Sequence, residues 1–138
     1  MLPNKNNEST HGITLTDEDT LCPVANQFSE GVYARTIFMP KGAMVVGKKH
    51  KTRHFNFIMT GEAWLWMDGH KSYIKAPYLL ESFEGVRKVL HIVEDMHWTT
   101  IHPTDSTDID EIEADIIKEE DEVAVLKDLN ELIKLTGE

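Results

Sequence analysis

The stretch from residue 47 to residue 61 reads GKKHKTRHFNFIMTG, and it decides the predicted fold class of this chain. A basic loop with two histidines, His50 and His54, leads into an apolar segment, and a glycine stands at each end. Side chains alternate between the two faces of a strand, so Lys48, His50 and His54 would share one face. The flanking glycines and the aromatic residues after His54 favour a strand over a helix. The stretch therefore predicts two imidazoles and an ammonium group on one side of a β-structure.

The rest of the chain predicts a single domain with more β-structure. Its 138 residues suffice for one hydrophobic core. Short strands separated by Gly and Pro turns are typical of a sandwich or barrel, and they occupy residues 31–103. Residues 1–30 are predicted as an N-terminal arm and an irregular segment. The predicted strands are Val32–Met39, Ala43–Val46, His54–Met59, Glu62–Met67, His70–Lys75, Val86–Val93 and His97–His102, with a turn at Thr60-Gly61 and a hairpin at Glu94-Asp95.

The net charge of −10 lies entirely in the C-terminal part. Residues 104–138 hold 13 of the 24 acidic residues and 3 of the 14 basic ones, so residues 1–103 are neutral. This distribution opposes nucleic-acid binding but permits a local pocket for one anionic group. The period changes to 3.6 in the same region, which predicts an acidic helical tail. Its apolar stripes are Ile109, Ile112 and Ile116, and then Val125, Leu129, Leu132 and Ile133.

Both stripes need a cover, and the barrel is expected to cover one of them. The second stripe then predicts an assembly contact, with a partner or with a second copy of the chain.

Compartment and partners follow from what the sequence lacks. No apolar run approaches membrane-spanning length, and the polar N-terminus is unlike a signal peptide. A single cysteine, Cys22, excludes an internal disulfide and a cysteine-based metal cage. We therefore expect no membrane partner and no secretion by a signal peptide. The cytoplasm is therefore the expected location.

The β-region resembles the cupin superfamily, whose fold is a small antiparallel barrel of jelly-roll type. Aligned on Gly61, the first cupin motif places His54 where the family has a glutamate, with His50 and Lys48 at the two preceding histidine positions. Lys88 falls where the second motif supplies a histidine, and the proline of that motif is absent. The resemblance implies a mainly β, cupin-like antiparallel barrel, and it implies a homo-oligomer because such chains commonly self-associate.

A closer likeness is to small, mostly uncharacterised cupin-like proteins of tailed bacteriophages. It covers roughly residues 32–118 and implies a virion component or a protein that interacts with the host, with no established activity. The matching stretches are residues 39–42, 50–54, 85–89, 98–105 and 107–113.

Two kinds of site fit these residues. His50 and His54 could begin a metal site that needs a third ligand, for which His91, His97 and His102 are the candidates by type. Because side chains alternate along a strand, His91 is expected on the face opposite to that of Lys88. Lys48 and Lys88 would repel a cation, so we expect no cofactor or, at most, a weakly bound divalent metal at His50 and His54.

The same side chains suggest an anion site. Lys48, His50, His54 and Lys88 would attract a carboxylate or phosphate. Arg53 and Arg87 would stand at the rim of this pocket.

Two functions therefore remain open. The first is a non-catalytic protein that binds a small anionic ligand or serves as a scaffold in virion or host interaction. The alternative is a metal-dependent small-molecule enzyme, isomerase-like or oxygenase-like, that uses His50 and His54. No nucleophile motif, phosphate loop or dinucleotide fingerprint occurs, so no catalytic residue is assigned.

Overall fold

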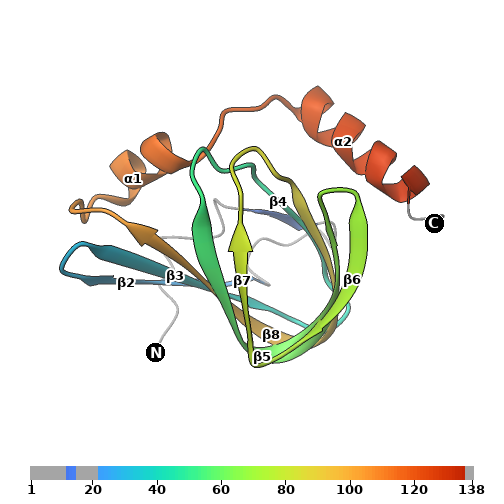
Figure 1. Ribbon diagram of the computed structural model, residues 1–138, viewed down its shortest axis with the longest axis horizontal. Coiled ribbons are helices and arrows are strands. Elements are labelled where there is room, and N and C mark those ends of the chain that lie inside the picture. Colours follow the sequence, from blue (N-terminus) through green and yellow to red (C-terminus); the bar gives the residue numbers. More distant parts are fainter. Residues whose placement is uncertain (1–11, 15–21, 136–138) are drawn as a thin grey trace.

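The computed structural model of the protein describes residues 12–14 and 22–135. Its strands form an antiparallel barrel, and two helices follow them over one end of that barrel (Figure 1). The mainly β fold predicted from the sequence is thus confirmed. The strands are β1 (Gly12–Thr14), β2 (Val24–Ser29), β3 (Val32–Met39), β4 (Met44–Gly47), β5 (His54–Met67), β6 (His70–Lys75), β7 (Tyr78–Ser82) and β8 (Lys88–Pro103), and the helices are α1 (Ile109–Ile116) and α2 (Glu122–Leu135).

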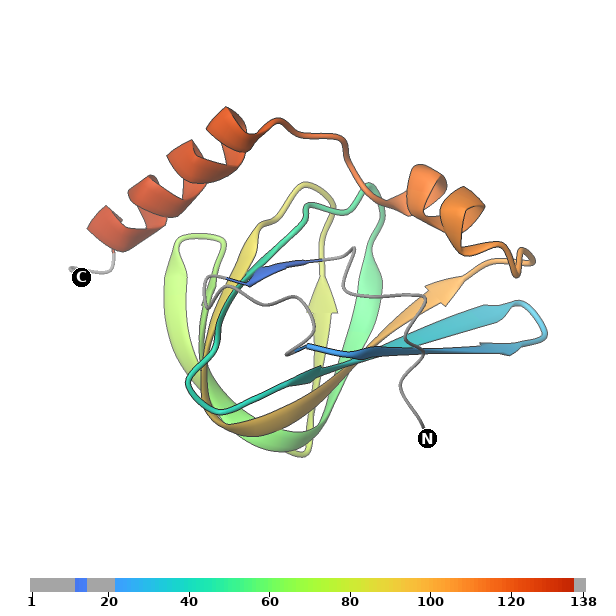
Figure 2. The ribbon, with the colours of Figure 1, turned by 180° about the vertical axis from the view of Figure 1, so that it is seen from behind.

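Two long strands, β5 and β8, hold the barrel together. They pair with each other from Phe55 opposite Ile101 to Met67 opposite Lys88. The first half of β5 also pairs with β7, and the second half pairs with β6. In the same way β8 pairs with β4 near its start and with β3 near its end. Each long strand therefore pairs with several neighbours along its length. Figure 2 shows the long strands curving around the barrel.

The predicted turn at Thr60-Gly61 and the predicted hairpin at Glu94-Asp95 are both wrong. The chain stays in β5 through Gly61, with register shifts against β8 between Ile58 and Ala63. Gly61 has a φ of +98°, so the glycine serves an irregularity inside a strand rather than a turn. A glycine in the sequence indicates a positive φ equally well for a turn and for an irregularity inside a strand, so the sequence alone does not distinguish the two.

Gly61→Ala tests this role. A Cβ at this position would lie 2.5 Å from the backbone oxygen of Asp95. Gly42 is the matched control, because its φ is +92° and a Cβ there would meet nothing within 4 Å. We expect Gly42→Ala to lower the free energy of unfolding by roughly 1–2 kcal/mol from backbone strain alone, and Gly61→Ala to cost at least about 2 kcal/mol more. Urea unfolding of both variants measures the difference, and equal losses would contradict the close approach of β5 and β8.

The inward faces of the strands divide into an apolar region and a polar region, because strand side chains alternate. The apolar region is the main core. It includes Ile37, Met39, Val45, Ile58, Leu90, Ile92, Met96 and Trp98. The polar region lies at the end of the barrel that the helices cover, and its members are also buried. It includes Arg35, His54, Asn56, Lys88, Thr100 and His102.

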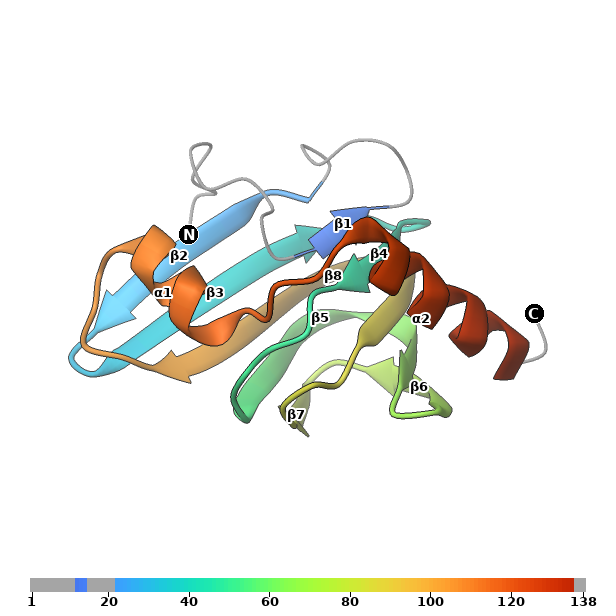
Figure 3. The same cartoon turned by 90° about the horizontal axis from the view of Figure 1, so that it is seen from above.

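The C-terminal segment covers this polar end (Figure 3). Helix α1 buries Ile112 and Ile116 against Tyr33. The chain then crosses the barrel mouth, where the amide of Lys51 donates to the carbonyl of Ile116 and the amide of Lys118 donates to the carbonyl of Lys49, at 2.7 and 2.9 Å. We call residues 116–121 the crossing segment.

Helix α2 continues this cover along the outside of the barrel. Its residues Val125 and Leu129 pack against Val46, Trp66 and Val89. The expectation that the barrel covers only the first apolar stripe is therefore wrong for Val125 and Leu129. The side chains of Leu132 and Ile133 lie outside the described part.

The irregular segment predicted within residues 1–30 contains a regular strand. Strand β2 pairs with β3 along its whole length, from Val24 opposite Ile37 to Ser29 opposite Val32. Strand β1 pairs with β4. The remaining predicted arm, residues 1–11 and 15–21, lies outside the described residues. Among the described helices, neither α1 nor α2 has the length and apolar character that a membrane crossing requires.

Candidate functional site

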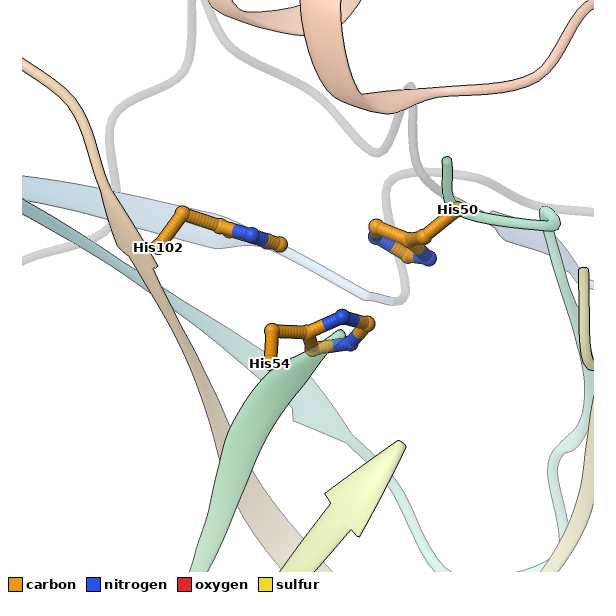
Figure 4. A group of neighbouring side chains, drawn as sticks. All are labelled: His50, His54 and His102. Carbon is orange, nitrogen blue, oxygen red and sulfur yellow. The ribbon is translucent and has the colours of Figure 1, made fainter. Parts of the chain in front are cut away.

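Three histidine rings converge at the polar end of the barrel (Figure 4). His50 comes from the loop between β4 and β5, His54 begins β5, and His102 stands near the end of β8. The ring centroids of His50 and His54 are 4.3 Å apart, and that of His102 lies 5.4 Å from the first and 4.7 Å from the second. One nitrogen from each ring can be chosen so that all three lie within 4.8 Å of one another. The structure thus joins the predicted pair His50 and His54 to His102.

Local pairing places each ring. His54 and His102 stand at inward positions of their strands, opposite Ser82 and Tyr33 respectively. The loop that carries His50 is pinned from two sides, because His50 forms a β-bridge with Ile117 and its carbonyl accepts the amide of Gly85 at 2.9 Å. The crossing segment therefore helps to hold His50 in the cluster.

Two buried cations accompany the histidines. Lys88 donates to the hydroxyl of Ser82 at 2.9 Å, and Arg35 is only 4% exposed, with no hydrogen-bond partner for its Nη2 atom. None of the ion pairs between described residues includes Arg35 or Lys88. An unpaired buried charge costs several kcal/mol, by order of magnitude. The polar end therefore carries positive charge that no ion pair among the described residues neutralises, although Glu113 lies near enough to favour the charged form of Arg35.

A small cavity of about 60 Å³ lies between these groups and the core. Its polar wall comes from Arg35, Lys48, His50, Lys88 and Thr100. Lys48 also lines a larger outer cavity of about 710 Å³, which the crossing segment borders. Lys48 thus stands between the small inner cavity and the outer one.

Burial governs the protonation of the histidines. It lowers the pKa of His50 to about 2, helped by repulsion from Lys88 and from the two other histidines. Burial and then Lys88 lower the pKa of His54 to about 4. For His102, burial, His54 and then Lys88 lower the pKa to about 3. All three imidazoles are therefore neutral at pH 7.

The two cations keep most of their charge at pH 7. Burial lowers the pKa of Lys88 to about 8. It also lowers the pKa of Arg35 to about 10, although Tyr33, Glu113 and Cys22 act in the opposite direction. The site at neutral pH consists of neutral imidazoles beside two positive groups.

Acid should destabilise the protein steeply. A histidine whose pKa is lower in the folded state costs stability as pH falls below its unfolded value of 6.5, because only the unfolded chain takes up the proton. Between pH 6.5 and about 4, each such histidine removes about 1.4 kcal/mol per pH unit, and the three approach about 4 kcal/mol per unit together. Urea midpoints at pH 7.5, 6 and 5 measure this loss. His102→Gln should reduce the slope by about one third, and a midpoint that does not change with pH would contradict the burial of the cluster.

Several candidate residues lie elsewhere. Arg53 turns to the exterior, where it pairs with Glu81 at 2.8 Å, so its placement at the pocket rim is wrong. Arg87 is buried, but it points to the tail: it donates to the carbonyl of Gly47 at 2.7 Å and pairs with Glu120 and with Asp128. Arg87 therefore does not stand at the rim of the small cavity as predicted. It lines the outer cavity instead.

The other two histidines that were candidates for a third ligand are not in the cluster. His97 shares a 2.8 Å hydrogen bond with the hydroxyl of Thr60, and His91 lies opposite Trp64 on the outward face.

Arg35 was missed from the sequence. Its signal was present, because Tyr33, Arg35, Ile37 and Met39 occupy alternate positions of one predicted strand, and the other three are apolar. A charged residue inside such a row is expected to point into the barrel with them. The burial of Arg35 at 4% exposure fits this pattern.

The three imidazoles are donors of the type that binds a divalent transition metal. The Nδ1 atom of His54 lies 3.1 Å from the carbonyl of Thr52, and this contact leaves Nε2 of His54 for a ligand. Neither ring nitrogen of His102 has a hydrogen-bond partner among the described residues. Three neutral imidazoles are suitable ligands for zinc, iron, nickel or copper. The nearby charges of Arg35 and Lys88 weaken such a site.

The comparisons with known proteins support the fold. No family model matches the sequence, and no curated protein matches it. The cupin domain of Cnp3 from Schizosaccharomyces pombe is similar in structure, with a TM-score of 0.53, 19% identity, and coverage of 61% of this chain and 65% of that domain. The fold is cupin-like.

Two further structures share the cupin-like barrel. A predicted oxalate decarboxylase from Thermotoga maritima matches with a TM-score of 0.51 and 15% identity over 75% of this chain and 100% of its own. Salicylate 1,2-dioxygenase from Pseudoaminobacter salicylatoxidans matches with a TM-score of 0.57 and 8% identity over 70% of this chain.

These likenesses establish the fold and nothing about activity. This chain spans less than two thirds of the fission-yeast domain and 28% of the dioxygenase. None of the three structures comes from a bacteriophage, so the closer likeness to phage proteins stays a prediction from the sequence.

Proposed function

We propose that this protein binds a small anionic ligand, without catalysis, at the polar end of its barrel. The observation that carries the proposal is the pair of buried cations, Arg35 and Lys88, neither of which forms an ion pair with a described residue. An anion between them would supply the missing charge, and charge-assisted hydrogen bonds are about twice as strong as neutral ones. Neutral His50 and His102 can add N–H donors to the same ligand.

Titration calorimetry with acetate and with phosphate at pH 7 tests the proposal. We expect one saturable site per chain for at least one of the two anions. Lys88→Met should weaken binding more than tenfold, because the charge that it removes is desolvated. Lys41→Met is the matched control, since Lys41 is exposed and lies 3.9 Å from Glu94, and it should bind as the parent does. If neither anion saturates, or if Lys88→Met binds equally well, the proposal fails.

The three-histidine cluster favours a second candidate, a metal-dependent enzyme of isomerase or oxygenase type. A divalent metal held by His50, His54 and His102 would supply a Lewis acid beside the anion-binding cations. On this candidate Arg35 and Lys88 would orient an anionic substrate.

Elemental analysis of untagged protein separates the two candidates. The charge of Arg35 and Lys88 leads us to expect less than stoichiometric metal, and His102→Gln should remove what is bound. Stoichiometric zinc or iron in untreated protein would favour the enzyme.

An outward apolar surface supports the scaffold role that the sequence resemblance implies. Phe55, Phe57 and Leu79 are 51%, 37% and 59% exposed, and Phe57 lies directly opposite Leu79 between β5 and β7. Apolar side chains that adjoin on a surface often mark a protein contact. We propose that a second copy of the chain binds here. Light scattering that compares the mass of Phe57→Ser with that of the parent tests for self-association. An unchanged mass would rule out self-association through this surface.

A further inference from the structure

We propose that the ligand of the small cavity is a short-chain monocarboxylate whose aliphatic end points into the barrel core. This inference rests on the proposed anion binding and adds the class of ligand. It follows from the two successive layers of side chains that line the cavity, one polar and one apolar.

The polar side chains form one level of the cavity wall. On β3 and β8, Arg35 stands opposite Thr100. Lys88 occupies the first position of β8, and its backbone oxygen lies 3.3 Å from where a Cβ of Gly47 would stand. Because Gly47 has no side chain, the backbones of β4 and β8 can come this close beside Lys88, and both residues line the cavity. These groups make a cationic level near the mouth.

The next inward residues of the same strands are apolar. Ile37 lies opposite Trp98, and Val45 lies opposite Leu90. All four line the cavity. Two residues along a strand correspond to about 6.5 Å, so the apolar level begins one short molecule's length below the cationic level.

The apolar level offers no donor to an anion. The indole Nε1 of Trp98 donates to Oδ1 of Asn56 at 2.9 Å, so its polar atom is already engaged. Inorganic phosphate or sulfate would place oxygens against this wall without hydrogen bonds, which costs free energy. A carboxylate with an aliphatic tail places each part against a matching surface.

The size of the cavity limits the ligand. About 60 Å³ is far below the roughly 300–1,000 Å³ of sites for drug-sized ligands, so only a few non-hydrogen atoms fit. A guanidinium group matches the two oxygens of a carboxylate. Acids of two to four carbons, from acetate to butyrate, therefore fit the cavity best.

A chain-length series measured by titration calorimetry tests this class. The probes are formate, acetate, propionate, butyrate, hexanoate and inorganic phosphate, each at pH 7. We expect affinity to rise about fourfold per methylene from acetate to butyrate, to fall at hexanoate, and to be weaker for phosphate than for propionate. Val45→Ala enlarges the apolar level, so it should move the optimum to a longer acid, and Ile37→Val serves the same purpose if Val45→Ala unfolds.

The outcomes separate this inference from the proposed function. If no anion binds, both fail. If phosphate binds as tightly as the carboxylates, or if all carboxylates bind within twofold of one another, the ligand class is wrong and anion binding stands. A rising series that neither cavity variant alters would show that the tail lies elsewhere, and it would also overturn the inference.

Discussion

Arg35→Met is expected to abolish anion binding and, at the same time, to make the ligand-free protein more stable. The guanidinium group is buried, 4% exposed, and in no ion pair among the described residues. Removing a desolvated charge that holds a ligand costs 2–5 kcal/mol of binding, which corresponds to roughly 30-fold to 1,000-fold or more in Kd. Replacing the same charge by an apolar side chain of similar length removes its desolvation cost, and we expect a gain of about 1–4 kcal/mol in the free energy of unfolding.

The two effects need two measurements and one control. Calorimetry with propionate measures binding, and urea unfolding in buffer without carboxylate or phosphate measures stability. Arg53→Met is the matched control, because Arg53 is exposed and paired with Glu81, and it should change neither quantity by more than about 1 kcal/mol. A loss of stability in ligand-free Arg35→Met would falsify the view that the desolvation of Arg35 outweighs the attractions it makes in the folded protein.

Arg87→Met is expected to release the tail from the barrel. Arg87 is 5% exposed at its side chain and contacts Glu120 and Asp128 of the tail. Removing one partner of a buried ion pair costs about 3–5 kcal/mol, because the remaining charges stay desolvated. We expect a loss near the lower end of this range, since Asp128 also pairs with Lys49 at 3.0 Å.

Amide hydrogen exchange shows where that stability is lost. The amide of Lys118, which donates to the carbonyl of Lys49, should exchange faster in Arg87→Met than in the parent. Amides in the centre of β5 should change only as much as global stability does. Uniform acceleration throughout the barrel would mean that Arg87 supports the whole fold rather than the tail, and the Arg53→Met control should show neither effect.

The sequence predicted the strands best where local patterning and the final pairing agree. Val32–Met39 and His70–Lys75, each ended by a local turn signal, have the predicted bounds. At Gly61 and at Glu94-Asp95 the local signal indicates a turn, but pairing between β5 and β8 continues through both. This pairing joins residues 21 to 46 positions apart in the sequence, and no local pattern records it. Strand β2 was missed for the same reason, since only its pairing with β3 orders it.

The candidate site was predicted in part. Parity brought Lys48 and His50 to the inner face, and the structure places them with Lys88 on one cavity, although binding by any of them stays a prediction. Arg53 and Arg87 were grouped with that pocket because basic residues adjacent in sequence were assumed to act together. Their acidic partners, Glu81 and Glu120, lie 28 and 33 residues away. Those contacts decide the orientations, and they depend on tertiary structure.

The crossing segment has a consequence for the speed of ligand exchange. It borders the outer cavity with Glu119, Glu120 and Asp121, through which a ligand passing Lys48 would reach the small cavity. The outer cavity is also lined by Lys48, Arg87 and Lys118, and Glu120 is already paired with Arg87. The carboxylates and the cations therefore offset one another, and an anion on this route should associate within the usual range of about 10⁵–10⁷ M⁻¹s⁻¹. Salt screens exposed charges, so the association rate should change little as ionic strength rises, unlike that of a protein that steers its ligand electrostatically.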